Sequence, residues 1–371
     1  MSAREGGLSV VLAGGGSAGH VNPLLATADA LRRRVPDARI VVLGTAEGLE
    51  ARLVPERGYE LTVVPKVPFP RRPDTTVLRF PARLRQAIHT ARTAIHDADA
   101  DVVVGFGGYV ASPAYLAARS VGVPIVIHEQ NARAGLANRL GARFTSAVAT
   151  TFASTELAHA RRVGLPLRAE IRDLDVAAAR AEGLAHFGLD EGRPTLLVFG
   201  GSLGALRLNT AFAAAAADLL EAGVQVLHLT GAGKEIEVPA SSSTGARYVA
   251  LPYTDRMELA YAVADLAVCR AGAGTVCELA AVGVPAVYVP LPVGNGEQRL
   301  NAADVVEAGG GLLVDDAEVT ADWVRESVIP LVTDAERLGA MAAAAAAHGE
   351  RDADDRLVDL ILAAADGTQP S

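Results

Sequence analysis

The chain has 371 residues, a length at which a single hydrophobic core usually gives way to two domains. Half of the residues are hydrophobic and 21% are charged, which excludes a disordered chain. The formal net charge of −9 excludes a general nucleic-acid binder, because no positive field attracts phosphates. Aromatic residues make up only 4%, a composition that favours parallel sheets covered by helices rich in small residues.

Short apolar runs alternate with helical stretches along the whole chain. In the first half, strands are predicted at 8–13, 38–43, 101–105 and 124–128, and the first helix at 22–34. The second half repeats the pattern, with strands predicted at 195–199, 224–228, 264–268 and 285–290. Strands joined by helical crossovers form parallel sheets. The predicted fold class is therefore α/β, with doubly wound parallel sheets.

A weak internal repeat divides the chain. Residues 10–19 and residues 196–204 each read as a buried strand, a glycine turn with a serine, and the start of a helix. Two Rossmann-like halves explain the length better than one long sheet. A charged, alanine-rich stretch at about 166–194 is predicted as the linker, which gives domains at 1–166 and 167–350. The last helix, near 351–365, could belong to either half.

Cysteine content and hydropathy indicate the cellular setting. Cys269 and Cys277 are too few for a disulfide framework or a zinc site, and we predict two buried free thiols in a reducing compartment. No apolar run reaches the roughly 18–20 residues that span a bilayer. We expect a cytoplasmic protein, attached at most to a membrane surface. The acidic run at 97–101 leads into a strand rather than out of one, so we predict no metal site.

The first glycine loop, Gly14-Gly-Gly-Ser-Ala-Gly19, follows a strand and precedes a helix. Such a loop brings backbone close to a ligand, and the N–H groups at the helix start attract anions. Glu47, after the second strand, would suit the ribose of a dinucleotide, as in an NAD-dependent dehydrogenase. A tight turn with no ligand is the structural alternative. His20 and the second glycine turn favour a ligand clamped between domains instead.

The second half carries a denser motif, Cys269-Arg-Ala-Gly-Ala-Gly-Thr-Val-Cys-Glu278, between a strand and a helix. Its small residues expose N–H groups at a helix start, which suits a diphosphate held without a metal ion. Glu278 lies about one turn into that helix, where a carboxylate can accept hydrogen bonds from a ribose diol. The alternative for Glu278 is an acid that merely complements the helix dipole. A polar loop at 294–301 leaves the next strand at its carboxyl end, where open α/β sheets bind ligands.

Residues 66–85 reverse the acidic charge of the chain. They contain one acid, Asp74, and interleaved apolar residues that include Phe69, Val77, Leu78, Phe80 and Leu84. The six basic residues are Lys66, Arg71, Arg72, Arg79, Arg83 and Arg85. Basic and apolar side chains together suit an anionic membrane surface. The alternative is a loop and helix with solvated arginines and a core-facing apolar stripe.

Five motifs, in order along the chain, resemble the MurG family, which belongs to glycosyltransferase family 28. The motifs are Gly14-Gly-Gly-Ser-Ala-Gly-His-Val-Asn-Pro23, Gly105-Phe-Gly-Gly-Tyr-Val110, His128-Glu-Gln-Asn131, Gly200-Gly-Ser-Leu-Gly-Ala205 and Arg270-Ala-Gly-Ala-Gly-Thr-Val-Cys-Glu278. The resemblance implies the GT-B fold, two Rossmann-like domains facing a cleft, with the C-terminal helix 351–365 packing back on the first. It also implies a first domain that faces acceptor and membrane, and a second that binds the donor.

The resemblance implies inverting transfer of GlcNAc from UDP-GlcNAc to the 4-hydroxyl of MurNAc in lipid I, undecaprenyl-diphospho-MurNAc-pentapeptide. The product, lipid II, serves peptidoglycan synthesis and so cell-wall biogenesis, cell shape and cell division. The expected location is the cytoplasmic face of the cell membrane, as a peripheral protein bound through residues 66–85. The implied partners are UDP-GlcNAc, lipid I and anionic lipid, with no nucleic acid, no cofactor and no metal.

By motif, the implied substrate-binding residues are Ser17, Ala18, Gly19, Asn131, Arg168, Ser202, Thr254, Ala273, Gly274, Thr275, Val276, Cys277, Glu278 and Gln298. The family usually has Thr-Gly-Gly where this chain has Ser17-Ala-Gly19, and commonly Gln-Gln where it has Glu297-Gln298.

The transfer needs a base that takes the proton of the attacking hydroxyl. His20, at a helix start that favours its neutral form, is one candidate, and Glu129 is the other. Positioning of the acceptor or of a phosphate is the alternative role for His20. Three alternatives to the whole interpretation are another GT-B transferase with a lipid or natural-product acceptor, an NAD-dependent dehydrogenase, and a non-catalytic nucleotide-sugar-binding module.

Overall fold

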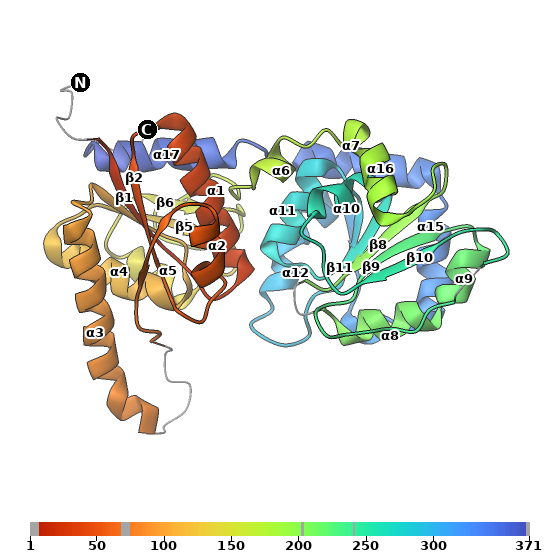
Figure 1. The fold of residues 1–371 in the computed structure, drawn as a ribbon, viewed down its shortest axis with the longest axis horizontal. Helices are drawn as coiled ribbons and strands as arrows, with labels where there is room; N and C mark the ends of the chain where they lie inside the picture. The colour runs from red at the N-terminus through yellow and green to blue at the C-terminus, as the bar shows by residue number, and fades with distance from the viewer. Residues whose placement is uncertain (1–6, 68–74, 202–203, 240–241, 369–371) are drawn as a thin grey trace. The chain divides into compact units, whose positions relative to one another are not determined.

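The computed structural model of the chain describes residues 7–67, 75–201, 204–239 and 242–368, without the side chains of residues 75–79. Its contacts divide the chain into two compact units (Figure 1). The first unit holds Met1–Arg168 and Asp352–Ser371, and the second holds Ala169–Arg351. The boundary after Arg168 lies two residues beyond the predicted position after Pro166.

The first unit contains a parallel sheet with the strand order β3-β2-β1-β4-β5-β6-β7. Its strands are β1 (Ser9–Ala13), β2 (Arg39–Gly44), β3 (Glu60–Val63), β4 (Val102–Gly105), β5 (Ile125–Glu129), β6 (Val148–Thr150) and β7 (Ala160–Arg162). Its helices are α1 (Ala18–Arg34), α2 (Glu50–Glu56), α3 (Thr75–Asp97), α4 (Gly108–Val121), α5 (Leu136–Gly141) and α17 (Ala353–Ala365).

Alternate residues of β1 enter separate cores on the two faces of this sheet, because strand side chains point to opposite sides. Val10 and Leu12 belong to a core that also contains Leu24 of α1 and Ile361 of α17. Val11 and Ala13 belong to a second core, built with apolar residues of α3 and α4. Helices therefore cover both faces, as a parallel sheet requires.

The C-terminal helix α17 packs on the first unit although the chain reaches it from the second (Figure 1). Its residues Leu357, Val358 and Ile361 are fully buried in the core that contains α1. Arg33 at the end of α1 contacts Asp354 at 3.2 Å and Asp355 at 2.7 Å. Apolar burial and ion pairing thus hold the same two helices together.

The second unit contains a parallel sheet with the strand order β10-β9-β8-β11-β12-β13. Its strands are β8 (Thr195–Phe199), β9 (Gln225–Leu229), β10 (Tyr248–Leu251), β11 (Leu266–Cys269), β12 (Ala286–Tyr288) and β13 (Gly311–Leu313). Its α-helices are α6 (Ala169–Arg172), α7 (Val176–Phe187), α8 (Leu206–Ala214), α9 (Ala216–Glu221), α10 (Met257–Val263), α11 (Ala273–Val282), α12 (Glu297–Asn301), α13 (Ala303–Glu307), α14 (Ala321–Trp323), α15 (Ile329–Val332) and α16 (Ala335–His348).

The stretch predicted as a linker at 166–194 is folded instead. It contains α6 and α7, and α7 packs against α10 in the second unit. Leu184 and Phe187 of α7 are buried, and Gly183 lies against the backbone of Leu259 and the side chain of Val263. The prediction was wrong because helical alanines on a packed face look, in sequence, like an alanine-rich connector.

The predicted fold class is confirmed: both sheets are parallel and doubly wound. Five strands, β3, β6, β7, β10 and β13, were not predicted from the sequence. Three of them are only three residues long. The other two, β3 and β10, are edge strands with no buried residue. Glu60 and Thr62 interrupt the apolar pattern of β3, whereas the four apolar residues of β10 were overlooked.

Neither cysteine forms a disulfide, and only Cys269 is buried. Cys277 lies half-buried on α11, so the prediction of two buried thiols was wrong for that residue. Among the described residues, no helix is both long and apolar enough to cross a membrane.

We predict that Ile361→Ala destabilises the first unit by about 2–5 kcal/mol, because it leaves a cavity in a core from which solvent is excluded. Native-state amide exchange of the slowest-exchanging residues of β1 and β4 measures the effect. The control is Asp359→Ala, which removes an exposed ion pair with Arg34 and should cost less than about 1 kcal/mol. Equal effects of the two variants would contradict a role of α17 in this core.

Candidate functional site

Each sheet has a point at which its strand order reverses. In the first unit β1 lies between β2 and β4, and in the second β8 lies between β9 and β11. Chain segments that leave two such neighbouring strands turn to opposite faces of the sheet and open a crevice at the carboxyl ends. The expected ligand-binding loops are therefore those after β1 and β4, and those after β8 and β11. They are the glycine-rich motifs of the sequence.

The loops after β1 and β4 touch through glycine backbone. A Cβ atom added to Gly108 would lie 2.6 Å from the carbonyl oxygen of Gly15. Gly108 also has a φ of +77°, a conformation that residues with side chains rarely adopt. The two motifs that the sequence places far apart thus form one site in the first unit.

The first loop has two sets of N–H groups. The N–H of Gly16 points inward and donates to Oε2 of Glu50 at 2.9 Å. The N–H groups of Ser17, Ala18 and Gly19 begin the 17-residue helix α1 and have no hydrogen-bond partner among the residues that the structure describes. Unpaired N–H groups at the positive end of a helix dipole form an anion-binding site.

His20 lies at the carboxyl edge of the sheet, in the first turn of α1. Its ring is half-buried, and Nδ1 lies 3.0 Å from Oγ of Ser17. The Nε2 side of the ring lies over Gly107, where an added Cβ would come within 3.2 Å. Burial lowers the pKa of His20, and the nearby Glu50 carboxylate opposes that shift. The imidazole is therefore neutral at physiological pH, as a proton acceptor must be.

Glu129, the other candidate base, is 2% exposed, and both of its carboxylate oxygens are occupied. Oε1 accepts from the N–H of Asn131 at 3.0 Å, and Oε2 accepts from the N–H of Gly135 and from Nδ2 of Asn138, both at 2.9 Å. Burial raises the pKa of Glu129, and these hydrogen bonds oppose the rise. The arrangement favours a carboxylate that holds the loop after β5 over one that takes a proton from a substrate.

Two carboxylates follow β2, and only one of them was considered in the sequence analysis. Glu50 was missed, although it is fully buried beneath the first glycine loop. Glu47, considered for a ribose, is exposed. Burial acts to raise the pKa of Glu50, but hydrogen bonds from Gly16 and Thr45 outweigh it and lower the pKa, so Glu50 is ionised. Gly44 and Gly48, which precede Glu50 in sequence and lie against its side chain, form no recognisable motif that would have indicated it.

In the second unit, the start of α11 follows β11, which lies next to β8 where the strand order of the sheet reverses (the switch point of the sheet). Gly272 precedes the helix, and the N–H groups of Ala273, Gly274 and Thr275 have no hydrogen-bond partner among the described residues. Val276, Cys277 and Glu278 complete the first two turns. Glu278 is half-buried, and its Oε2 accepts from the hydroxyl of Tyr261 at 2.8 Å. Tyr261 is itself 1% exposed, so its fixed hydroxyl orients the carboxylate.

Two further predicted residues of the second unit also follow strands. Thr254 comes after β10, is buried, and accepts the N–H of Arg256 at its Oγ1. Gln298 lies in α12 after β12, and its Oε1 accepts the N–H of Leu291 at 2.9 Å. Ser202 lies outside the described residues. Arg168 is half-buried at the end of the first of the two segments that make up the first unit.

Most of the predicted site residues thus lie at the carboxyl edge of one sheet or the other. In the first unit, Ser17, Ala18, Gly19 and His20 lie at the carboxyl edge of the sheet, and Glu129 and Asn131 follow β5 at the same edge. In the second unit, the start of α11, Thr254 and Gln298 lie at the corresponding edge. The described residues contain no group of three or more histidine, cysteine or acidic side chains that could hold a metal ion.

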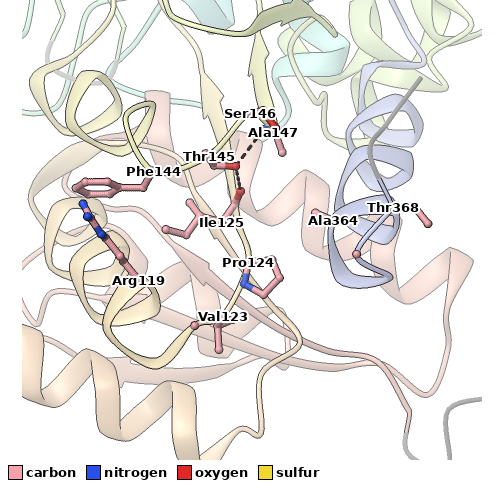
Figure 2. Close-up of a pocket in the computed structure, with 12 residues that line it drawn as sticks. Arg119, Val123, Pro124, Ile125, Phe144, Thr145, Ser146, Ala147, Ala364 and Thr368 are labelled. Carbon is pink, nitrogen blue, oxygen red and sulfur yellow. Dashed lines mark hydrogen bonds between the residues drawn. The ribbon is translucent and has the colours of Figure 1, made fainter.

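A separate cavity of about 490 Å³ lies at the opposite, amino-terminal edge of the first sheet (Figure 2). It lies between the segments that precede β5 and β6 and the end of α17. The guanidinium of Arg119 lies over the ring of Phe144, 4.4 Å from its centroid (Figure 2). The side-chain hydroxyl of Thr145 donates a hydrogen bond to the backbone carbonyl of Ile125. Among the described residues, no carboxylate or histidine lines this cavity.

Comparison with known proteins identifies both units. Residues 10–150 match the glycosyltransferase family 28 N-terminal domain, and residues 195–357 match the glycosyltransferase family 28 C-terminal domain. A Nocardioides protein named UDP-N-acetylglucosamine--N-acetylmuramyl-(pentapeptide) pyrophosphoryl-undecaprenol N-acetylglucosamine transferase is 58% identical over 356 residues, 96% of this chain and 98% of that protein. A protein of the same name from Leifsonia xyli is 58% identical over 351 residues, 95% of this chain and 97% of that protein.

Solved structures agree with these matches. The crystal structure of Acinetobacter baumannii MurG has a TM-score of 0.78 and 30% identity, covering 96% of this chain and 99% of that one. The calicheamicin glycosyltransferase CalG4 has a TM-score of 0.67 at 19% identity, covering 99% of this chain and 100% of that one, and shows the fold alone. The resemblance to the MurG family and the expected GT-B fold are confirmed, and the dehydrogenase alternative is wrong.

We predict that the imidazole of His20 titrates below the ordinary histidine value of about 6.5, because burial disfavours its charged form. Histidine-ring NMR across a pH series measures the midpoint, and the signal missing from His20→Gln assigns it. A His20 midpoint at or above about 6.5 would contradict the neutral imidazole.

Proposed function

The chain belongs to glycosyltransferase family 28, and from this membership we propose that it transfers GlcNAc from UDP-GlcNAc to the MurNAc 4-hydroxyl of lipid I, with inversion. The product is lipid II of peptidoglycan synthesis. The observation that carries the proposal is 58% identity, over 96% of this chain, to a relative named for this reaction. The two groups of loop residues at the switch points supply the chemistry that the transfer requires.

In this proposal the second unit binds the donor. The N–H groups at the start of α11 accept the diphosphate of UDP-GlcNAc, and the helix dipole stabilises the charge that develops on departing UDP. Glu278, oriented by Tyr261, accepts hydrogen bonds from the ribose hydroxyls. Thr254 meets the uracil through its backbone, and Gln298, with Ser202 and Arg168, completes the nucleotide-sugar site.

The first unit binds the acceptor and performs the proton transfer. His20 is proposed as the base that takes the proton of the attacking hydroxyl, since its imidazole is neutral and half-buried next to unpaired N–H groups. Ser17, Ala18 and Gly19 contact the transferred sugar, together with Asn131. Glu129 is proposed to fix the loop that carries Asn131, because the N–H of Asn131 donates to the Glu129 carboxylate.

We propose further that the protein is peripheral, at the cytoplasmic face of the membrane, and binds anionic lipid through residues 66–85. Arg83 and Arg85 are exposed on α3, which supports an electrostatic contact. Phe80 and Leu84 pack against the core of the first unit, so they are placed for folding rather than for insertion into lipid. Residues 68–74 and the side chains of 75–79, including Arg79, lie outside the described part of the chain.

The proposed reaction is tested by turnover. Purified protein with UDP-GlcNAc and a lipid I analogue in detergent should release UDP and form the disaccharide product, and neither substrate alone should give UDP at a comparable rate. Binding of UDP-GlcNAc without any transfer would instead identify a nucleotide-sugar-binding module.

We predict that Glu278→Ala raises KM for UDP-GlcNAc roughly 10–150-fold, since hydrogen bonds to a charged group contribute about 1.5–3 kcal/mol. Steady-state kinetics with varied donor measures the change. Tyr261→Phe, which removes the orienting hydroxyl, should raise KM by a smaller factor. Glu307→Ala, an exposed carboxylate of α13, is the matched control. An unchanged KM in folded Glu278→Ala would mean that Glu278 only complements the helix dipole.

We predict that the wild-type protein co-sediments with vesicles that contain anionic lipid, that salt weakens this binding, and that the Arg79, Arg83, Arg85→Glu triple variant stays in solution. Each basic residue near such a surface contributes about 1 kcal/mol. Zwitterionic vesicles are the lipid control. The charge-matched variant, Arg299, Arg325, Arg337→Glu, alters exposed arginines of the second unit and should bind like wild type. Equal binding by wild type and the α3 variant would remove this segment from the membrane contact.

A further inference from the structure

Glu50 is a buried carboxylate that no step of the proposed reaction uses. It is the first residue of α2, and solvent does not reach it. Its Oε1 accepts from the N–H of Thr45 at 2.8 Å and from the Thr45 hydroxyl at 2.7 Å. Its Oε2 accepts from the N–H of Gly16 at 2.9 Å. A buried charge persists only where hydrogen bonds or ion pairs replace water, and here neutral donors from two loops do so.

The backbone around Glu50 is built to admit its side chain. Three glycines surround the carboxylate: Gly15 in the loop after β1, Gly44 at the end of β2, and Gly48 just before α2. A Cβ atom at these positions would lie 2.2, 2.4 and 2.1 Å, respectively, from atoms of Glu50. Three separate segments therefore leave room for one carboxylate directly beneath the first glycine loop.

The hydrogen bond from Gly16 to Glu50 orients the residues that follow Gly16 in the loop. Gly16 has a φ of +92°, so the chain turns there, and the inward N–H fixes the direction of that turn. The next residues are Ser17, Ala18 and Gly19, whose N–H groups begin α1, and then His20. A loop that was free to rotate at Gly16 would not hold these groups in one arrangement.

We propose that Glu50 is a positioning residue: its carboxylate holds Gly16 inward and so fixes the start of α1, with His20, in the conformation that glycosyl transfer needs. The effect on glycosyl transfer rests on the proposed function. The restraint of the loop by Glu50 does not depend on that function. Preorganised donors are effective in catalysis because they need not reorient in the transition state.

Glu50→Gln separates this role from simple filling of space. Both carboxylate oxygens of Glu50 can only accept hydrogen bonds. They therefore suit the three donors that face them, the N–H of Gly16 and the N–H and hydroxyl of Thr45. A glutamine amide that keeps its oxygen toward Thr45 must turn its NH₂ group toward the N–H of Gly16. Two donors then face each other, and the loop bond is lost while the volume of the side chain is kept. Glu47→Gln, an exposed carboxylate three residues earlier in sequence, is the matched control.

Two readouts test the proposal. Hydrogen–deuterium exchange of peptides covering residues 14–20 should be at least tenfold faster in Glu50→Gln, with exchange of the second unit unchanged. In the transfer assay kcat should fall at least tenfold, while KM for UDP-GlcNAc changes by a smaller factor, because the second unit holds the nucleotide and the loop contacts only the transferred sugar. Glu47→Gln should match wild type in both.

Unchanged loop exchange or unchanged kcat in Glu50→Gln would overturn the proposal, as would faster exchange spread evenly over the first unit. If Glu50→Gln does not fold, the Glu50→Asp variant tests the proposal instead. That variant keeps the charge but shortens the reach to Gly16, so it should show faster exchange at 14–20 and a lower kcat, and wild-type values would overturn the proposal. A wild-type protein that transfers no GlcNAc would refute the proposed function, whereas the exchange comparison would still decide the restraint by Glu50.

Discussion

Parallel strands bring their carboxyl ends, and the first N–H groups of the helices that follow, to one edge of a sheet. In this chain the constraint acts twice, because β1 lies between β2 and β4 and β8 lies between β9 and β11. Loops that leave neighbouring strands toward opposite faces open a crevice at that edge. Short glycine turns then place helix starts in the crevice, where their N–H groups attract anions. The placement of His20 in one unit and Glu278 in the other follows from this strand order.

Buried carboxylates hold the loops of the first unit. Glu50 accepts hydrogen bonds beneath the loop after β1, and Glu129 accepts three beneath the loop after β5. Burying a charge is unfavourable unless hydrogen bonds replace the lost water, so each loop is tied to the conformation that supplies them. The second unit uses a different device, since half-buried Glu278 is oriented by the hydroxyl of Tyr261. Rigid loops in one unit and an oriented carboxylate in the other suit a reaction that depends on positioning.

Strong local signals made much of this structure predictable. Buried runs such as 195–199 and the glycine turns after them gave both sheets and the loops that carry His20 and Glu278. Glu50 was missed because its partner, Gly16, lies 34 positions away, and no local pattern reports a contact across that distance. Amphipathic α3 had an apolar stripe that suits either a core or a lipid surface, and only packing showed that Phe80 and Leu84 face the core. The linker was misplaced for the same reason: the burial of α7 depends on α10, whose contact the sequence does not reveal.

The central claim is that these switch-point loops bind a nucleotide sugar. Saturation-transfer NMR of the full-length protein, with UDP-GlcNAc and NAD present together at equal concentration, tests it most directly. The account predicts transfer to the uracil, ribose and N-acetyl protons of UDP-GlcNAc, reduced in Glu278→Ala, and none to NAD. Saturation of the nicotinamide and adenine protons without a signal from UDP-GlcNAc would contradict it.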